Sequence, residues 1–143
     1  MNVSNAFASA ILFGVNKGLN HLMNEAGGKA VCRYIGIEMY NFLKVRGLIK
    51  DEMTKEDLKE LLVSKLGLAK DVEIKEEDSG VSLKIIEPTL TDFIEQMMKE
   101  HVPLVLCPYV ATVSIIYSKR YGRLAVSEFK PIEGGIKLRL EKF

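Results

Sequence analysis

The spacing of apolar residues changes period three times along this chain, and this limits the possible folds more than any other sequence feature. From Phe7 to Leu66, apolar residues recur at intervals of three and four, as on amphipathic helices. From Val72 to Ile85 they alternate with charged residues, as on strands with one wet face. Helical spacing returns from Leu90 to Tyr117, and alternation returns from Leu124 to Leu140. This order predicts an α+β domain in which an antiparallel four-stranded sheet is covered by helices.

Glycine, proline and capping residues divide these stretches into elements. Gly27 and Gly28 separate the first two helices, because glycine readily forms the left-handed end of a helix. Thr54 and Asp57 resemble a capping box at the start of the third helix, and Pro108 suits the first position of the last helix. Helices are predicted over residues 3–23, 29–45, 54–66, 90–98 and 108–122, and two hairpins over residues 72–85 and 124–140.

Length and composition predict one domain covering residues 1–143. The chain has 143 residues, of which 48% are hydrophobic, enough for a single core. A net charge of +1 gives no broad field for nucleic acid, so nucleic acid is not an expected partner. The uncharged stretches are too short or too interrupted for a membrane span. The two cysteines, Cys32 and Cys107, are too few for a disulfide scaffold, so we expect a reducing, cytoplasmic location.

The first helix is apolar around much of its circumference. Large apolar residues such as Phe7 and Ile11 are interleaved with small ones, and Gly14 and Gly18 allow another helix to approach closely. Such a helix is either buried on several sides or covered by a second copy of the chain. We therefore expect a homodimer.

Motifs that carry catalysis or bind cofactors are absent from the sequence. It contains no GxGxxG after a strand, no GxxxxGK[ST], no HExxH and no GxSxG. His21 and His101 are interpreted as structural or solvated residues. The basic residues Lys119 and Arg120 lie at a helix end, where the helix dipole accounts for them. No catalytic residues, metal ligands or cofactor are predicted, and an enzymatic function is not favoured.

Cys107 supports two interpretations. It precedes a helix that starts at Pro108, and a helix N-terminus lowers a thiol pKa, which would make the thiol reactive. The alternative is an inert core residue, because free cysteine is among the most buried residue types. Cys32 gives less reason to expect a function.

Tyrosine side chains provide the other candidates for a binding site. Tyr34, Tyr40, Tyr109 and Tyr117 lie on helical stretches with other aromatic and methionine residues. Such residues line apolar pockets, in which a tyrosine hydroxyl can fix the polar end of a ligand. They also fill ordinary cores, and the sequence leaves both alternatives open.

The C-terminal third resembles the 4-vinyl reductase domain family. The resemblance rests on Cys107-Pro108-Tyr109, a helix ending at Gly122, Val126-Ser127-Glu128 and Gly134-Gly135. It implies a fold similar to vesicle-tethering TRAPP subunits and haem nitric-oxide-binding domains, and a role in binding hydrocarbons or other small molecules. Many family members carry two cysteines near the places of Pro131 and Arg139, so the resemblance implies no cysteine metal site here.

The resemblance and the residues together give three hypotheses. The first is a non-enzymatic domain that binds an apolar or amphipathic small molecule, with Cys107, Tyr109, Tyr34, Tyr40 and Tyr117 as ligand-binding residues and a cavity near Cys107 and Tyr109. The second is a protein-interaction or scaffolding subunit without a small ligand. The third is an enzyme acting on an apolar substrate, with Cys107 as nucleophile or Glu128 as proton carrier.

Overall fold

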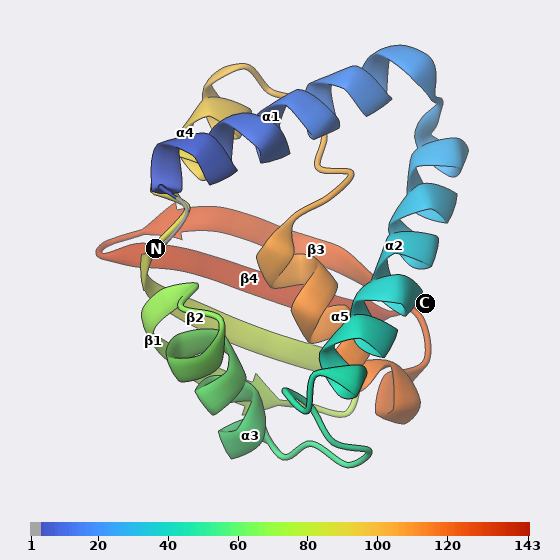
Figure 1. Ribbon diagram of the computed structural model, residues 1–143, viewed down its shortest axis with the longest axis vertical. Helices are drawn as coiled ribbons and strands as arrows, with labels where there is room; N and C mark the ends of the chain where they lie inside the picture. Colours follow the sequence, from blue (N-terminus) through green and yellow to red (C-terminus); the bar gives the residue numbers. More distant parts are fainter. Residues whose placement is uncertain (1–3) are drawn as a thin grey trace.

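The computed structural model describes residues 4–143 and confirms the predicted α+β class. Helices and strands follow one another in the predicted order (Figure 1). The predicted helix start at residue 3 lies outside the described residues. The elements are α1 (Asn5–Leu22), α2 (Glu25–Val45), α3 (Lys55–Glu60), a π-helical turn η1 (Leu61–Lys65), β1 (Ala69–Glu76), β2 (Gly80–Pro88), α4 (Thr91–Lys99), α5 (Pro108–Tyr121), β3 (Leu124–Ile132) and β4 (Gly135–Lys142).

Two antiparallel hairpins form one sheet with the strand order β1-β2-β4-β3. In the central row, Leu83 of β2 lies between Ile74 of β1 and Leu138 of β4. Leu83 and Leu138 are buried, whereas Lys84, which points to the other face, is exposed. The alternation of apolar and polar residues thus gives the sheet one buried and one solvent-exposed face, as predicted.

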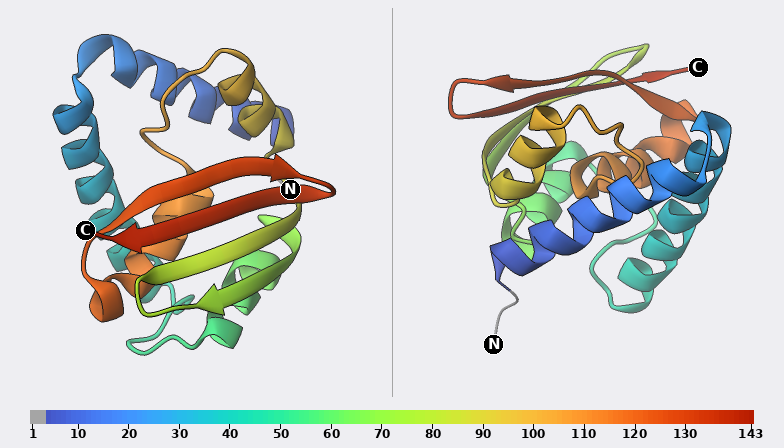
Figure 2. Two further views of the ribbon diagram at one scale, coloured as in Figure 1. Left: turned by 180° about the vertical axis from the view of Figure 1, so that it is seen from behind. Right: turned by 90° about the horizontal axis from the view of Figure 1, so that it is seen from above.

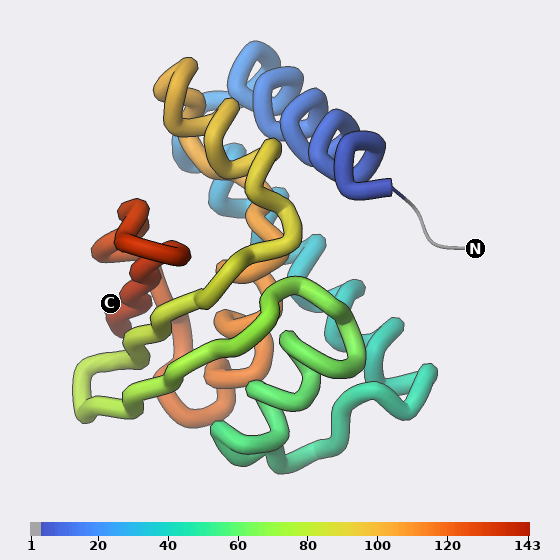
Figure 3. Tube along the Cα trace, turned by 90° about the vertical axis from the view of Figure 1, so that its left-hand side faces the viewer, coloured from blue at the N-terminus to red at the C-terminus, as the bar shows by residue number. Residues whose placement is uncertain are grey.

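The helices lie on the buried face of the sheet, which Figure 2 shows along its edge in the right-hand view. α5 crosses the middle of the sheet, while α1 and α2 meet at a corner and form an outer L (Figure 1). α4 lies beside α1 at one end of the molecule, and α3 lies at the opposite end (Figure 3). No helix within residues 4–143 is long and apolar enough to cross a membrane.

Capping residues account for most helix ends. The Thr54 hydroxyl accepts a hydrogen bond from the Asp57 amide at 3.1 Å, and the Asp57 carboxylate accepts one from the Thr54 amide at 3.0 Å. The predicted capping box is therefore confirmed. α5 begins at Pro108 and ends at Gly122, also as predicted.

The predicted start of the second helix at residue 29 is wrong. α2 begins at Glu25, because the Asn24 side chain accepts a hydrogen bond from the Gly27 amide at 2.8 Å and so acts as the N-cap. Gly27 and Gly28 lie inside the first turns instead of ending α1. At Gly28, an added Cβ would lie 3.6 Å from Val105, so this glycine lets the helix approach its neighbour.

Candidate ligand groove on helix α2

A groove of about 520 Å³ lies along the outer side of α2. Every residue that lines it belongs to this helix: Tyr34, Ile35, Glu38, Met39, Phe42 and Leu43. Tyr34 is 73% exposed and Phe42 is 58% exposed, whereas Leu43 is buried at the base. The groove is therefore a shallow apolar surface, open toward solvent.

Small residues on the inner side of α2 explain why its large apolar side chains face outward. At Gly36, an added Cβ would lie only 3.0 Å from Cγ2 of Ile115 on α5. Gly28 faces Val105 and Gly36 faces Ile115 of α5, so neither contact point on α2 carries a side chain. Close approach through glycine seats the helix on α5 and leaves Tyr34 and Phe42 outside the core.

Glu38 is the one lining residue that carries a carboxylate, and it contributes mainly its methylene groups, because the lining is almost wholly apolar. At one end, the Arg46 guanidinium lies 5.1 Å from the centre of the Phe42 ring. The Lys44 ammonium lies over the Tyr40 ring at 5.9 Å and forms an ion pair with Asp51. This arrangement suits the apolar body of a ligand.

The structure places one of the five predicted ligand-binding residues, Tyr34, in this groove. Tyr40 lies on the same helix but does not line the groove, and it is only half-buried. Ile35, Met39, Phe42 and Leu43 recur at helical spacing in the sequence, but apolar spacing alone does not say which part of a helix is covered.

Cys107 lies in the core as the N-cap residue of α5, with 3% of its surface exposed. Burial raises the pKa of its thiol to about 11, although the amides of Val110 and Tyr109 act in the opposite direction. The lowered pKa that a helix N-terminus favours is therefore outweighed by loss of solvent. Burial also raises the pKa of the half-buried Cys32.

The Tyr109 hydroxyl connects two segments of the fold. It donates a hydrogen bond to the Leu68 carbonyl at 2.6 Å and accepts one from the Leu90 amide at 3.3 Å. Burial raises its pKa to about 12. The hydroxyl thus joins the segments before β1 and after β2, and Tyr109 does not line the groove.

Tyr117 is also buried, and its hydroxyl donates a hydrogen bond to Oε1 of Glu76 at 2.9 Å. Burial, followed by this contact with a carboxylate, raises its pKa. Arg120 pairs with the other carboxylate oxygen of Glu76, so the predicted helix-end charge has a specific partner on β1. These contacts attach α5 to the edge of the sheet.

The ligand-binding roles of Cys107, Tyr109, Tyr40 and Tyr117 stay predictions.

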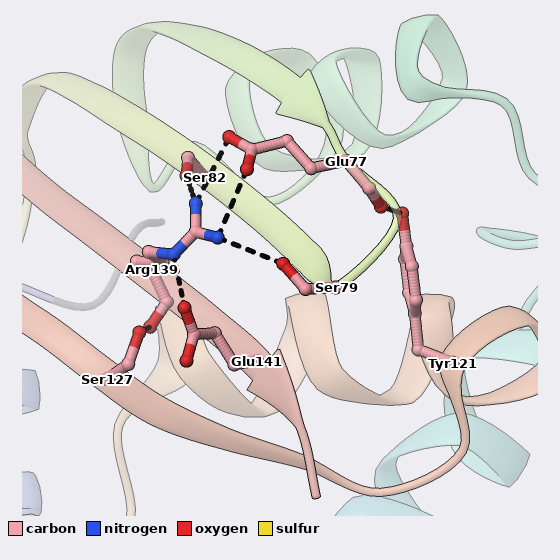
Figure 4. Close-up of polar contacts among 7 residues, drawn as sticks. All are labelled: Glu77, Ser79, Ser82, Tyr121, Ser127, Arg139 and Glu141. Carbon is pink, nitrogen blue, oxygen red and sulfur yellow. Dashed lines mark hydrogen bonds and ion pairs between the residues drawn. The ribbon is translucent and has the colours of Figure 1, made fainter.

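Arg139 on the wet face of the sheet forms the densest polar cluster (Figure 4). Its guanidinium donates two hydrogen bonds of 3.1 Å to Glu77 and one of 2.7 Å to Glu141. The hydroxyls of Ser82 and Ser79 accept the others, at 2.7 and 3.2 Å. All five guanidinium N–H groups therefore donate hydrogen bonds within the chain. The cluster stabilises the β1–β2 turn and leaves no donor free to bind an anion.

Glu128, the candidate proton carrier, lies on β3 near Lys130 at 3.0 Å and Lys137 at 3.6 Å. The close contact with the Lys130 ammonium, together with the positive charge of both lysines, lowers its pKa. A proton carrier at this position would need the opposite shift.

Asn16 is a structural residue that the sequence analysis missed. It is fully buried on α1, and its side chain donates hydrogen bonds to the carbonyls of Leu12 and Leu106 at 2.8 and 2.7 Å. Its Oδ1 accepts hydrogen bonds from the amides of Val105 and Leu106 at 2.7 and 2.8 Å. An asparagine within an apolar helix was the available signal, because a buried amide needs partners.

Comparison with known proteins gives a family and a relative. A family model described as "Putative rubredoxin C-terminal domain" matches residues 8–142. An uncharacterized protein of Methanocaldococcus jannaschii is 36% identical over 142 residues, which cover 98% of this chain and 89% of the relative. The resemblance to the 4-vinyl reductase domain family is not confirmed by these matches.

Proposed function

This chain belongs to the rubredoxin C-terminal domain family, and from that premise we propose that it is a non-enzymatic domain that binds an apolar or amphipathic small molecule in the α2 groove. The observation that carries the proposal is the groove itself, with its apolar lining and with Glu38 among its residues. The groove has a volume of about 520 Å³ and is open toward solvent, so its apolar lining supports the proposal and enclosure does not.

Glu38 defines the chemical class of ligand within this proposal. A carboxylate beside apolar walls attracts a positive charge or a hydrogen-bond donor and disfavours an anionic head group. We therefore propose a ligand with an apolar body and a cationic or donor end. Tyr34 and Phe42 would contact the apolar body, and Glu38 would contact its polar end.

The family description mentions rubredoxin, but the residues of this chain do not fit an iron centre of that kind. Iron held by thiolates alone uses four cysteines, and this chain has two. Cys107 is buried at the start of α5, Cys32 lies on α2, and residues 4–143 contain no cluster of three or more His, Cys, Asp and Glu side chains suited to a metal. The proposal therefore includes no redox step in this domain.

The shifts at Cys107 and Glu128 give no support to an enzymatic alternative. Burial raises the pKa of the Cys107 thiol, and the Lys130 ammonium lowers the pKa of the Glu128 carboxylate. A nucleophilic thiol and a proton carrier need shifts in the opposite directions.

A protein-interaction function is the second candidate, and the apolar residues beyond the groove favour it. Ile37 and Val45 are exposed on α2, and Leu22 is exposed on α1. Large apolar side chains that stay exposed are candidates for contact with another molecule. We also propose that the domain is a homodimer and, on its cysteine usage, that it is cytoplasmic.

Fluorescent probe titration tests the small-molecule proposal. The probes are a cationic dansyl-alkylamine and its neutral N-acetylated counterpart, and the expected result is tighter binding of the cationic probe. Glu38→Gln should remove that preference without affecting the neutral probe. Phe42→Ala should weaken both about 10-fold or more, since burial of a phenylalanine contributes roughly 1.5–3 kcal/mol.

The matched control is Phe7→Ala on α1, since Phe7 is 60% exposed and Phe42 is 58% exposed. Equal effects of the two substitutions would contradict a specific groove. Absence of binding by both probes at millimolar concentration would shift the function to the protein-interaction candidate.

A further inference from the structure

Helix α1 contributes no apolar side chain to the buried core. Its two buried side chains are those of Ser9 and Asn16, which are polar, while its apolar side chains are exposed or half-buried. In the right-hand view of Figure 2, α1 lies on the side of α4 and α5 that is away from the sheet. Because burial of apolar surface is the main favourable contribution to folding, α1 is bound to the domain more weakly than the core elements are.

Polar contacts with one short segment attach α1 to the domain. Asn16 makes three hydrogen bonds of 2.7 to 2.8 Å with residues 103–106, and Asn20 makes one of 2.8 Å with the same segment. Lys17 and Glu100 form an ion pair that is partly exposed and so contributes little. In the part of the chain that the structure describes, no backbone hydrogen bond joins α1 to another element. The buried amide of Asn16 is therefore the main polar attachment.

Ser9, Gly14 and Gly18 each lower the stability of the attached helix. The buried Ser9 hydroxyl has no hydrogen-bond partner within residues 4–143, which is unfavourable. An added Cβ at either glycine would meet no atom within 4 Å, and neither glycine has a positive φ, so the fold does not require glycine at these positions. Each glycine lowers helix stability about fivefold relative to alanine. An isolated helix of this kind is unstable in water, so α1 unfolds when it separates.

The connection between α1 and α2 allows this separation. Met23 and Asn24, which link the two helices, both have extended backbone. The Met23 amide donates to the Leu19 carbonyl within α1, and the Asn24 carbonyl accepts from the Gly28 amide within α2, both at 2.9 Å. The N-cap of α2 needs no residue of α1, so α1 can leave without breaking a hydrogen bond of α2.

We propose that α1 is a releasable cover, which detaches and unfolds as one unit while the sheet and α5 stay folded, with Asn16 as its latch. Its release uncovers the sides of α4 and of residues 103–106 that it contacts. The inference concerns α1 and not the α2 groove, so it does not depend on the proposed small-molecule function.

Native-state hydrogen exchange of the full chain at low urea concentrations tests this inference. Peptides from both ends of α1 should exchange at one common rate, at least about 10-fold faster than peptides of β2 and β4. Their exchange should depend little on urea, because opening of one helix exposes less surface than unfolding of the domain. Exchange that decreases gradually from the ends of α1 inward, or protection equal to that of the sheet, would overturn the inference.

A substitution in the sheet distinguishes release of α1 from unfolding of the whole domain. Leu83→Ala removes a buried side chain of β2 and should speed exchange of the sheet amides at least about 30-fold. It should leave α1 exchange unchanged, because β2 stays folded when α1 leaves. An equal rise in both would show that α1 opens only with the domain. Ile85→Val, a smaller truncation at a fully buried site, replaces Leu83→Ala if that variant does not fold.

Substitutions within α1 test the latch and the unfolding of the helix. Asn16→Ala should speed α1 exchange about 100-fold, since two amides lose their acceptor. Asn20→Ala is the matched control, and an equal effect of the two substitutions would contradict the latch. The double variant Gly14→Ala with Gly18→Ala should slow α1 exchange about 20-fold. Unchanged exchange in this variant would contradict unfolding of α1 on release.

Discussion

Removal of the Asn16 side chain should destabilise the protein more than its size suggests. The amide is fully buried and makes four hydrogen bonds, three of them with residues 105 and 106 in the segment before α5. Asn16→Ala leaves the Val105 and Leu106 amides without an acceptor. Each unsatisfied amide costs about 1–3 kcal/mol, and both residues are half-buried, so we expect a loss of about 3 kcal/mol.

Urea unfolding followed by circular dichroism measures this loss. With a slope of about 2 kcal/mol per molar urea, the midpoint should fall by about 1.5 M. Hydrogen exchange should show faster exchange at Val105 and Leu106. Asn20→Ala is the control, because Asn20 donates only to the carbonyls of Asn16 and Pro103 and leaves no amide unsatisfied. A loss below 1 kcal/mol for Asn16→Ala, equal to that of Asn20→Ala, would refute the reasoning.

Three further predictions follow from single residues. His101 ends α4 with a φ of 52°, so His101→Gly should raise the unfolding free energy by about 0.5–1 kcal/mol in the same urea assay, and destabilisation would contradict it. The hydrogen bond from Arg139 lowers the pKa of Glu77, and this contribution to stability is present above the ordinary glutamate pKa and lost as pH falls through the folded value. The stability difference between wild type and Arg139→Met should therefore be largest near pH 7 and shrink below about pH 4, as unfolding curves at several pH values would show. Cys107 should resist iodoacetamide at pH 7 until the protein unfolds, while Cys32 reacts first; peptide mass spectrometry showing rapid labelling of native Cys107 would oppose this.

Local sequence patterns were sufficient for the order of elements. Successive side chains of a strand point to opposite faces of the sheet. The alternating apolar residues, among them Leu83 and Leu138, therefore lie together on the buried face. Thr54 with Asp57, and Pro108 with Gly122, marked helix ends through contacts within a few residues. The sequence did not predict the helix start at Glu25, because Gly27 and Gly28 are compatible both with the end of a helix and with close packing inside one. Only the contact between Gly28 and Val105, far away in the chain, shows that close packing is the reason.

The candidate site depended on contacts between residues far apart in the chain. Tyr34 and Tyr109 carry the same side chain on helices, yet one is exposed in a groove and the other bonds to Leu68 and Leu90 in the core. Apolar spacing says that a side chain avoids water, but not whether the neighbour that covers it belongs to the same chain.

The sequence by itself determined the α+β class, the two hairpins and the wet face of the sheet, because periodicity and capping act over a few residues. Only the tertiary structure decided that glycines let α2 approach α5 closely, that its aromatic side chains face outward, and that burial raises the pKa of Cys107. The reason is that solvent exposure and pKa depend on which distant elements lie alongside a residue, and no local pattern specifies them.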